Sequence, residues 1–146
     1  MAESIRTMGL VGPGTIVRAV AYVTILMVLI KRLNMHEYLD DDGYPTDHAL
    51  DRIEHWSYTA DPRGWFEFIR SIWNFGDWGW KELTEPSDWK ENSQVLRYYV
   101  STGGWSGNED IIRAMQQNHV LWSTTWVQTR RGGHYIFEVS NESSQS

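Results

Sequence analysis

The sequence predicts an α+β domain with a mostly antiparallel four-stranded sheet, in the element order ααββαββ. Three observations lead to this prediction. Apolar side chains recur at helical spacing between residues 47 and 73. They alternate at strand spacing in residues 96–100 and 135–139. The sequence RRGG at 130–133 stands between the last two apolar runs, and its adjacent glycines suit the positive φ angles of a tight hairpin.

The two helices before the sheet are each expected to begin at a capping residue. Thr46 would cap a helix across residues 47–57, because its side-chain oxygen accepts a hydrogen bond from an unpaired amide of the first turn. Asp61 followed by Pro62 marks the start of the second helix, since proline fits the first helical position. This second helix carries a stripe of aromatic and isoleucine side chains and is expected to end at Gly76.

Two strands are expected between residues 77 and 101, separated by a loop that contains Pro86. In the first strand, Trp78 and Trp80 would lie on the same face. In the second strand, alternating apolar residues define the buried face, and these are Leu96, Tyr98 and Val100.

A third helix is expected over Asn108–Asn118. The run VLWSTTWVQT at 120–129 is interpreted as a strand, because β-branched and aromatic residues are common in strands. It would pair with HYIFEVS at 134–140, and Trp122 and Trp126 would then lie on one face of the sheet.

Residues 1–34 differ in composition from the rest of the chain and are interpreted as an N-terminal extension. Residues 35–140 are expected to form a single domain, and residues 141–146 form a polar tail. The uninterrupted apolar run Ala19–Ile30 has twelve residues. A membrane-spanning helix needs roughly 20. Three interpretations stay open for the extension: translation that starts at Met35, a membrane anchor or secretory signal, or a helix buried against the domain.

The chain has a formal net charge of −6 and no cysteine. The lack of cysteine excludes a disulfide scaffold, thiolate zinc sites and a cysteine nucleophile. Residues 35–146 hold 18 acidic and nine basic residues, a balance that disfavours direct nucleic-acid binding and is compatible with a basic protein partner. His48, Asp51 and His55 lie on one face of the first helix, but no second cluster completes a metal site, so no metal or cofactor is expected.

The segment STGGWSGNEDII at 101–112 connects an expected strand to an expected helix. Phosphate-binding loops and plain structural turns both occur at such connections. Ser106 and Glu109 match the capping box, in which each side chain pairs with a backbone amide at the helix start. Glu109 and Asp110 would repel an incoming anion, and the lysine of a Walker loop is missing. A capped turn is therefore favoured, and a partner-contact loop and an anion site stay open as alternatives.

Cationic groups concentrate in the hairpin sequence RRGGHY at 130–135, where guanidinium groups would bind carboxylate or phosphate bidentately. If the hairpin lies beside the glycine loop, the two would line one cleft, with Trp105 as an aromatic anchor. The residues expected to bind a ligand or partner are Gly103, Gly104, Trp105, Ser106, Asn108, Arg130, Arg131 and His134.

An enzymatic alternative comes from the same loop, which nearly matches the hydrolase motif G-x-S-x-G except that Asn108 replaces the last glycine. A catalytic Ser106 would take His119 or His134 as its base. The favoured interpretation is non-catalytic, and it assigns no catalytic residue.

The combination of DWGW at 77–80, TGGWSGNEDII at 102–112 and RRGGHYIFE at 130–138 resembles a group of small bacteriophage and prophage proteins of unknown function. The resemblance covers residues 36–140. It implies a cytosolic product of an infected bacterial cell, and no activity or site residue follows from it.

The function expected from these features is that of a small acidic binding module that acts on a host protein in the cytoplasm. One alternative is a binder or hydrolase of a small phosphate-bearing ligand in a cleft between Gly103 and Arg130. Another is a membrane-associated accessory protein, if residues 9–30 insert into a bilayer.

Overall fold

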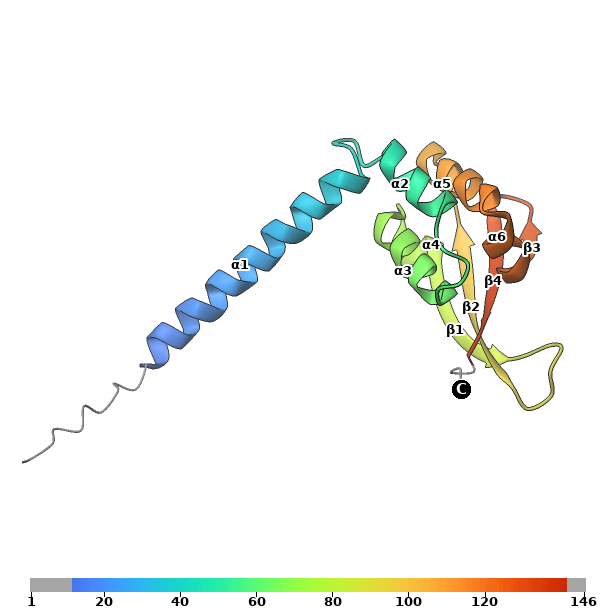
Figure 1. Ribbon diagram of the computed structural model, residues 1–146, viewed down its shortest axis with the longest axis horizontal. Coiled ribbons are helices and arrows are strands. Elements are labelled where there is room, and N and C mark those ends of the chain that lie inside the picture. The colour runs from blue at the N-terminus through green and yellow to red at the C-terminus, as the bar shows by residue number, and fades with distance from the viewer. Residues whose placement is uncertain (1–11, 142–146) are drawn as a thin grey trace, which may run out of the picture. The chain divides into compact units, whose positions relative to one another are not determined.

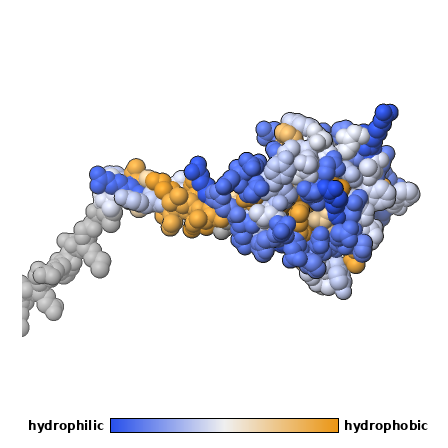
Figure 2. Space-filling view, turned by 90° about the horizontal axis from the view of Figure 1, so that it is seen from above, coloured by the Kyte–Doolittle hydropathy of each residue, from blue (hydrophilic) through white to orange (hydrophobic). Residues whose placement is uncertain are grey.

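The structure, a computed structural model, describes residues 12–141, and the chain divides into two compact units between Met35 and His36. Most of the first unit is helix α1 (Pro13–Tyr38; Figure 1), which has 26 residues. Twelve large apolar side chains from Ile16 to Leu33 are 47–74% exposed, and Figure 2 shows the apolar band that they form along the helix. By length and composition, α1 is suited to cross a membrane.

The second unit has the predicted α+β organisation (Figure 1). Its elements are α2 (Asp47–Glu54), α3 (Pro62–Ile72), α4 (Gly76–Gly79), β1 (Trp80–Pro86), β2 (Gln94–Ser101), α5 (Ser106–Gln117), α6 (His119–Thr125), β3 (Trp126–Arg130) and β4 (His134–Ser140). The strands form one sheet in the order β1-β2-β4-β3, and every neighbouring pair is antiparallel. The predicted fold class is confirmed.

One apolar core joins the helices to the sheet. Phe66 of α3 stacks on Tyr98 of β2 with ring centroids 4.1 Å apart, and its ring also lies 5.4 Å from Phe137 of β4. Helices α2, α5 and α6 contribute further buried residues to the same cluster, among them Ile53, Ile111, Met115 and Leu121. These four helices therefore pack on the face of the sheet that carries Tyr98 and Phe137.

Successive side chains of a strand point to opposite faces, so the residues that alternate with Tyr98 and Phe137 lie on the other side of the sheet. We call this side the open face. Cross-strand neighbours on it are Arg97 with Glu138 and Tyr99 with Ile136.

The two predicted helix starts are confirmed. Thr46 Oγ1 accepts a hydrogen bond from the Ala49 amide at 3.2 Å, at the start of α2. Asp61 Oδ1 accepts one from the Arg63 amide at 2.9 Å, and Pro62 is the first residue of α3. Both caps are local in sequence, which is why the sequence pattern suffices to find them.

The chain between α3 and β1 differs from the prediction. Helix α3 ends at Ile72, and Gly76 begins the short helix α4 rather than ending α3. Phe75 adopts a φ of +64°, a left-handed conformation that redirects the chain between the two helices. Trp78 consequently lies in α4 and is 62% exposed, whereas Trp80 is buried at the start of β1, so the two rings do not share a strand face.

The strand predicted over residues 120–129 is wrong in its first half, where α6 forms instead. Asn118 caps this helix by accepting a hydrogen bond from the Leu121 amide at 3.2 Å. The side-chain Nδ2 of Asn118 also donates to the carbonyls of Ile53 and Trp56, at 3.3 and 3.0 Å. A cap that is bonded to a distant segment overrides the local preference for strand.

The last hairpin has the predicted turn. Strands β3 and β4 pair Arg130 with His134, and both glycines of the RRGG turn adopt positive φ angles, 94° and 76°. Trp122 and Trp126 stack with centroids 6.1 Å apart, although Trp122 belongs to α6 and only Trp126 belongs to the sheet.

Candidate partner-binding site

The glycine loop between β2 and α5 is organised by Thr102. Its Oγ1 donates to the carboxylate of Glu109 and accepts from the amide of Gly104 at 3.4 Å. Ser106 caps no amide and instead donates to the hydroxyl of Tyr44 at 3.4 Å. The predicted capping box is therefore wrong, because the Glu109 carboxylate is bonded to Thr102 and the first helical residue is Ser106 itself.

Asn108 fastens this loop to the segment before α4. Its side chain is fully buried, and its Oδ1 accepts from the Asn74 amide at 3.0 Å. Its Nδ2 donates to the carbonyls of Asn74 and Thr102, at 2.9 and 3.2 Å. We expected Asn108 to touch a partner, but a fully buried side chain cannot do so. It positions the residues around it.

Four aromatic rings gather around the loop that Asn108 holds. They come from three segments distant in sequence, and we call them the aromatic patch: Tyr44, Phe75, Trp78 and Trp105. The ring of Trp105 lies 4.7 Å from Tyr44 and 6.5 Å from Phe75, and Phe75 stacks on Trp78 at 5.2 Å. Tyr44, Phe75 and Trp78 are 37%, 38% and 62% exposed. A contiguous group of exposed rings is typical of a surface that binds another molecule.

Gly103 lies directly beneath the aromatic patch. A Cβ at this position would come within 2.8 Å of Trp78 Cη2 and 3.0 Å of Phe75 Cδ2, and the residue has a φ of +64°. Only glycine meets both conditions without strain. The predicted site residue Gly103 thus contributes through its small size, which lets the two rings close over the backbone.

Carboxylates border the aromatic patch, and we call them the acidic rim: Asp41, Asp42 and Asp77. The first two lie in the turn that leads to Tyr44, Asp77 lies in α4, and all three are exposed. Asp40 is structural, because its Oδ1 accepts from the amides of Asp42 and Tyr44 at 3.0 and 2.8 Å. These exposed carboxylates beside the rings are suited to pair with a basic surface.

The cationic hairpin residues form a second site, on the open face. Arg130 and His134 line a hollow of about 310 Å³ together with Tyr99 and Ser101. His134 Nδ1 lies 2.6 Å from Ser101 Oγ. Arg131 is exposed at the turn and is not part of the lining.

The glycine loop and the hairpin do lie together, since the Thr102 amide donates to the Gly133 carbonyl at 3.0 Å. The hollow that Arg130 lines does not include Gly103, and a shared cleft between the two stays a prediction. Gly103 contacts the aromatic patch and Arg130 lines the hollow on the open face. Within residues 12–141, Ser106 forms no hydrogen bond to a histidine, and so the arrangement gives a catalytic Ser106 no base.

The histidine of α2 and the one that follows its last residue are each paired with a single carboxylate. His48 lies 3.0 Å from Glu37, and His55 lies 3.1 Å from Asp51. Across the part of the chain that the structure describes, no group of three or more histidine or acidic side chains is arranged to hold a metal ion.

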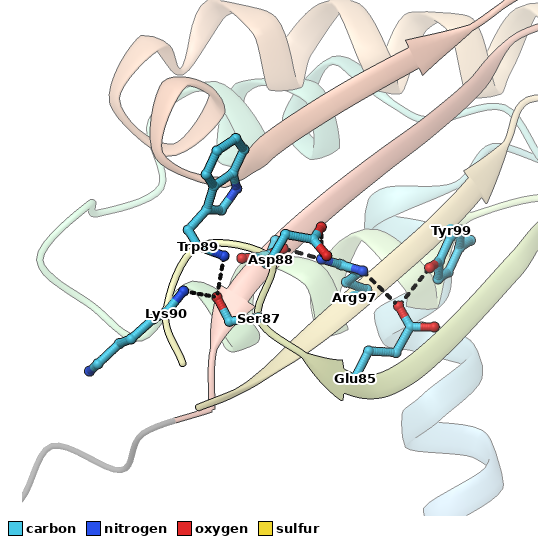
Figure 3. A network of polar contacts seen from close by, with 8 residues as sticks. Glu85, Ser87, Asp88, Trp89, Lys90, Arg97 and Tyr99 are labelled. Carbon is cyan, nitrogen blue, oxygen red and sulfur yellow. Dashed lines mark hydrogen bonds and ion pairs between the residues drawn. The ribbon is translucent and has the colours of Figure 1, made fainter. Parts of the chain in front are cut away.

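A network around Arg97 on the open face was not anticipated from the sequence (Figure 3). The Arg97 side chain is 13% exposed and pairs with Glu85 at 3.2 Å, Glu138 at 3.1 Å and Asp88. Burial opposes its charge, but the hydrogen bonds to Glu138 and Glu85 outweigh burial and raise the pKa of Arg97. The network becomes visible only once the register places Arg97 opposite Glu138.

The hydroxyl of Tyr99 donates to Glu85 at 2.7 Å, and this bond is the main cause that lowers the pKa of Glu85 below 4.5. A depressed carboxyl pKa adds stability above the unfolded-state value, and this contribution is lost as the pH falls through the folded-state value. Tyr99→Phe is expected to raise the pKa of Glu85 towards 4.5, as measured by carbon-13 NMR titration of the carboxyl group. Tyr58→Phe, at an exposed tyrosine, is the control and should leave that titration unchanged. An unchanged Glu85 curve in Tyr99→Phe would contradict the assignment.

Comparison with protein-family models, with curated proteins and with solved structures finds no match for this chain. The resemblance to bacteriophage and prophage proteins therefore stays a prediction.

Proposed function

We propose that this chain is a non-catalytic binding module whose aromatic patch contacts a basic segment of a protein partner. The observation that carries the proposal is the patch itself, in which rings from three segments meet at the surface over Gly103. Trp78, its most exposed ring, is placed to bury in a partner as an anchor. The sequence resemblance suggests that this partner is a protein of a bacterial host cell.

The acidic rim supports a basic partner. Lysine and arginine side chains pair with exposed carboxylates and also lie favourably over aromatic faces. The rim residues Asp41, Asp42 and Asp77 offer the first kind of contact, and the exposed face of Trp78 offers the second. Electrostatic complementarity of this sort speeds association and selects the partner.

Site-specific photocrosslinking tests the proposal, with a photoreactive phenylalanine analogue at position 78 of the full chain in bacterial cells. Position 89 is the matched control, because Trp89 is also an exposed tryptophan, at 88%, and lies in the β1–β2 loop. We expect a discrete adduct from position 78 only. The double substitution Asp41→Asn and Asp42→Asn should weaken it, whereas Asp40 is left intact because it holds the turn. Equal adducts from both positions, or an adduct indifferent to the double substitution, would contradict the proposal.

A second proposed role is attachment to a membrane through α1. The exposure of the apolar side chains along this helix favours this role. In the apolar stretch of α1 that could span a membrane, none of the residues is buried against the rest of the protein. Exposed apolar surface on this scale is unfavourable in water and favourable in a bilayer. This role is compatible with the first, because the core of the second unit is complete within residues 36–141.

A further inference from the structure

The hollow on the open face is lined by basic and polar side chains that play no part in the proposed binding of a basic partner. It lies between three strands because the register sets Ser101 opposite His134, Tyr99 opposite Ile136, and Arg130 opposite His134. All five side chains line the hollow, whose volume is about 310 Å³. Ligand sites of small molecules begin at roughly 300 Å³, so the space suits a small organic ion.

The charge of the hollow is opposite to that of the chain as a whole. Its lining includes a guanidinium and an imidazole and no carboxylate, although the chain has a net charge of −6. Within residues 12–141, Arg130 forms no ion pair, in contrast to Arg97 on the same face, which is bonded to three carboxylates. The planar guanidinium of Arg130 is therefore available for two parallel hydrogen bonds to an anion.

His134 supplies a further donor. When the Ser101 hydroxyl donates to Nδ1 across 2.6 Å, the neutral imidazole carries its proton on Nε2. Arg130 alone satisfies the two oxygens of a carboxylate. A phosphate has a third oxygen, which could accept a hydrogen bond from the His134 Nε2–H group.

Beside the Arg130 guanidinium and the His134 imidazole, the hollow has an apolar floor. Ile136 is 7% exposed, and the neighbouring Tyr99 ring is fixed because its hydroxyl is bonded to Glu85 at 2.7 Å. The two carboxylates of this face that adjoin the floor, Glu85 and Glu138, are both paired with Arg97. A flat or apolar organic group would thus lie on Tyr99 and Ile136 while its phosphate reaches Arg130.

From this arrangement we infer that the hollow on the open face binds a small phosphate monoester with an apolar or aromatic organic group. Arg130 and His134 bind the phosphate, Ser101 positions His134, and Tyr99 with Ile136 supports the organic group. The site is independent of the aromatic patch, so its test neither supports nor weakens the proposed protein partner.

The test is isothermal titration of phenyl phosphate into the full chain, held in solution by a non-ionic detergent. We expect binding that Arg130→Gln weakens about tenfold or more, as for the loss of a hydrogen-bonded charge. Arg131→Gln removes the same charge one residue away, outside the hollow, and should change the dissociation constant less than about twofold. Thermal unfolding of both variants should match the parent, because both side chains are exposed.

Benzoate and inorganic phosphate are control ligands that test the contributions of the phosphate and of the organic group separately. Both are expected to bind more weakly than phenyl phosphate, the first because it lacks the third oxygen and the second because it lacks the ring. The inference is overturned if phenyl phosphate does not bind at concentrations up to about 10 mM. It is also overturned if benzoate binds as tightly, or if the two arginine variants lose affinity equally.

Discussion

Replacement of Asn108 by alanine is expected to lower the free energy of unfolding of the second unit by about 3 kcal/mol. The substitution removes three hydrogen bonds and leaves the Asn74 amide, the Asn74 carbonyl and the Thr102 carbonyl without this partner. Buried or part-buried polar groups without partners carry the cost of their lost hydration. Because the same bonds hold the loop beneath the aromatic patch, Asn108→Ala should also loosen Trp78.

Urea unfolding followed by tryptophan fluorescence measures this effect. All nine tryptophans lie between residues 56 and 126, so the signal reports only the second unit of the full chain. Ser106→Ala is the control in the same helix, because Ser106 is exposed and caps no amide, and its effect should stay within about 0.5 kcal/mol. An Asn108→Ala variant as stable as this control would show that Asn108 does not hold the loop.

Membrane attachment of the full chain should be abolished by the double substitution Ile25→Arg and Leu29→Arg. The two positions lie one turn apart on α1 and are 57% and 50% exposed. Each arginine near the centre of a bilayer costs about 2.5–3.5 kcal/mol on insertion scales. The pair therefore adds enough free energy to prevent insertion of a single helix.

Flotation of cell lysate in a sucrose gradient distinguishes membranes from aggregates, because only membrane-bound protein rises. The parent chain and the control Ile25→Ala with Leu29→Ala should float, and the double arginine variant should stay at the bottom. A parent chain that does not float would contradict membrane attachment. It would leave the proposed binding surface unaffected, since the aromatic patch belongs entirely to the second unit.

Features that depend on neighbouring residues were predictable from the sequence. Thr46 and Asp61 cap their helices through bonds to residues two or three positions away, and the RRGG turn needs only glycine at positive φ. The strand predicted before Trp126 failed because Asn118 is bonded to Ile53 and Trp56, more than sixty residues away. Local preference could not reveal a bond of that separation.

The sequence named Trp105, Arg130 and His134 as binding residues, but it did not reveal how the fold groups them, and their role in binding stays a prediction. A shared cleft was expected for Trp105 and Arg130 only if their segments met in the fold. In the structure Trp105 packs on Tyr44, and Arg130 lines a hollow on the open face. Tyr44 and Phe75 carry no signal of their own in the sequence. They enter the site because Phe75 adopts a left-handed conformation and because Asn108 ties its segment to the glycine loop.

The central claim is that Trp78 anchors a protein partner, and the most direct test is an affinity comparison with the partner captured by crosslinking. Trp78→Ala should weaken binding about thirtyfold, equivalent to roughly 2 kcal/mol, as expected for a central aromatic anchor. Trp89→Ala removes an equally large exposed ring outside the aromatic patch and should change the dissociation constant less than about twofold. Equal affinities for the Trp78→Ala and Trp89→Ala variants would contradict the account.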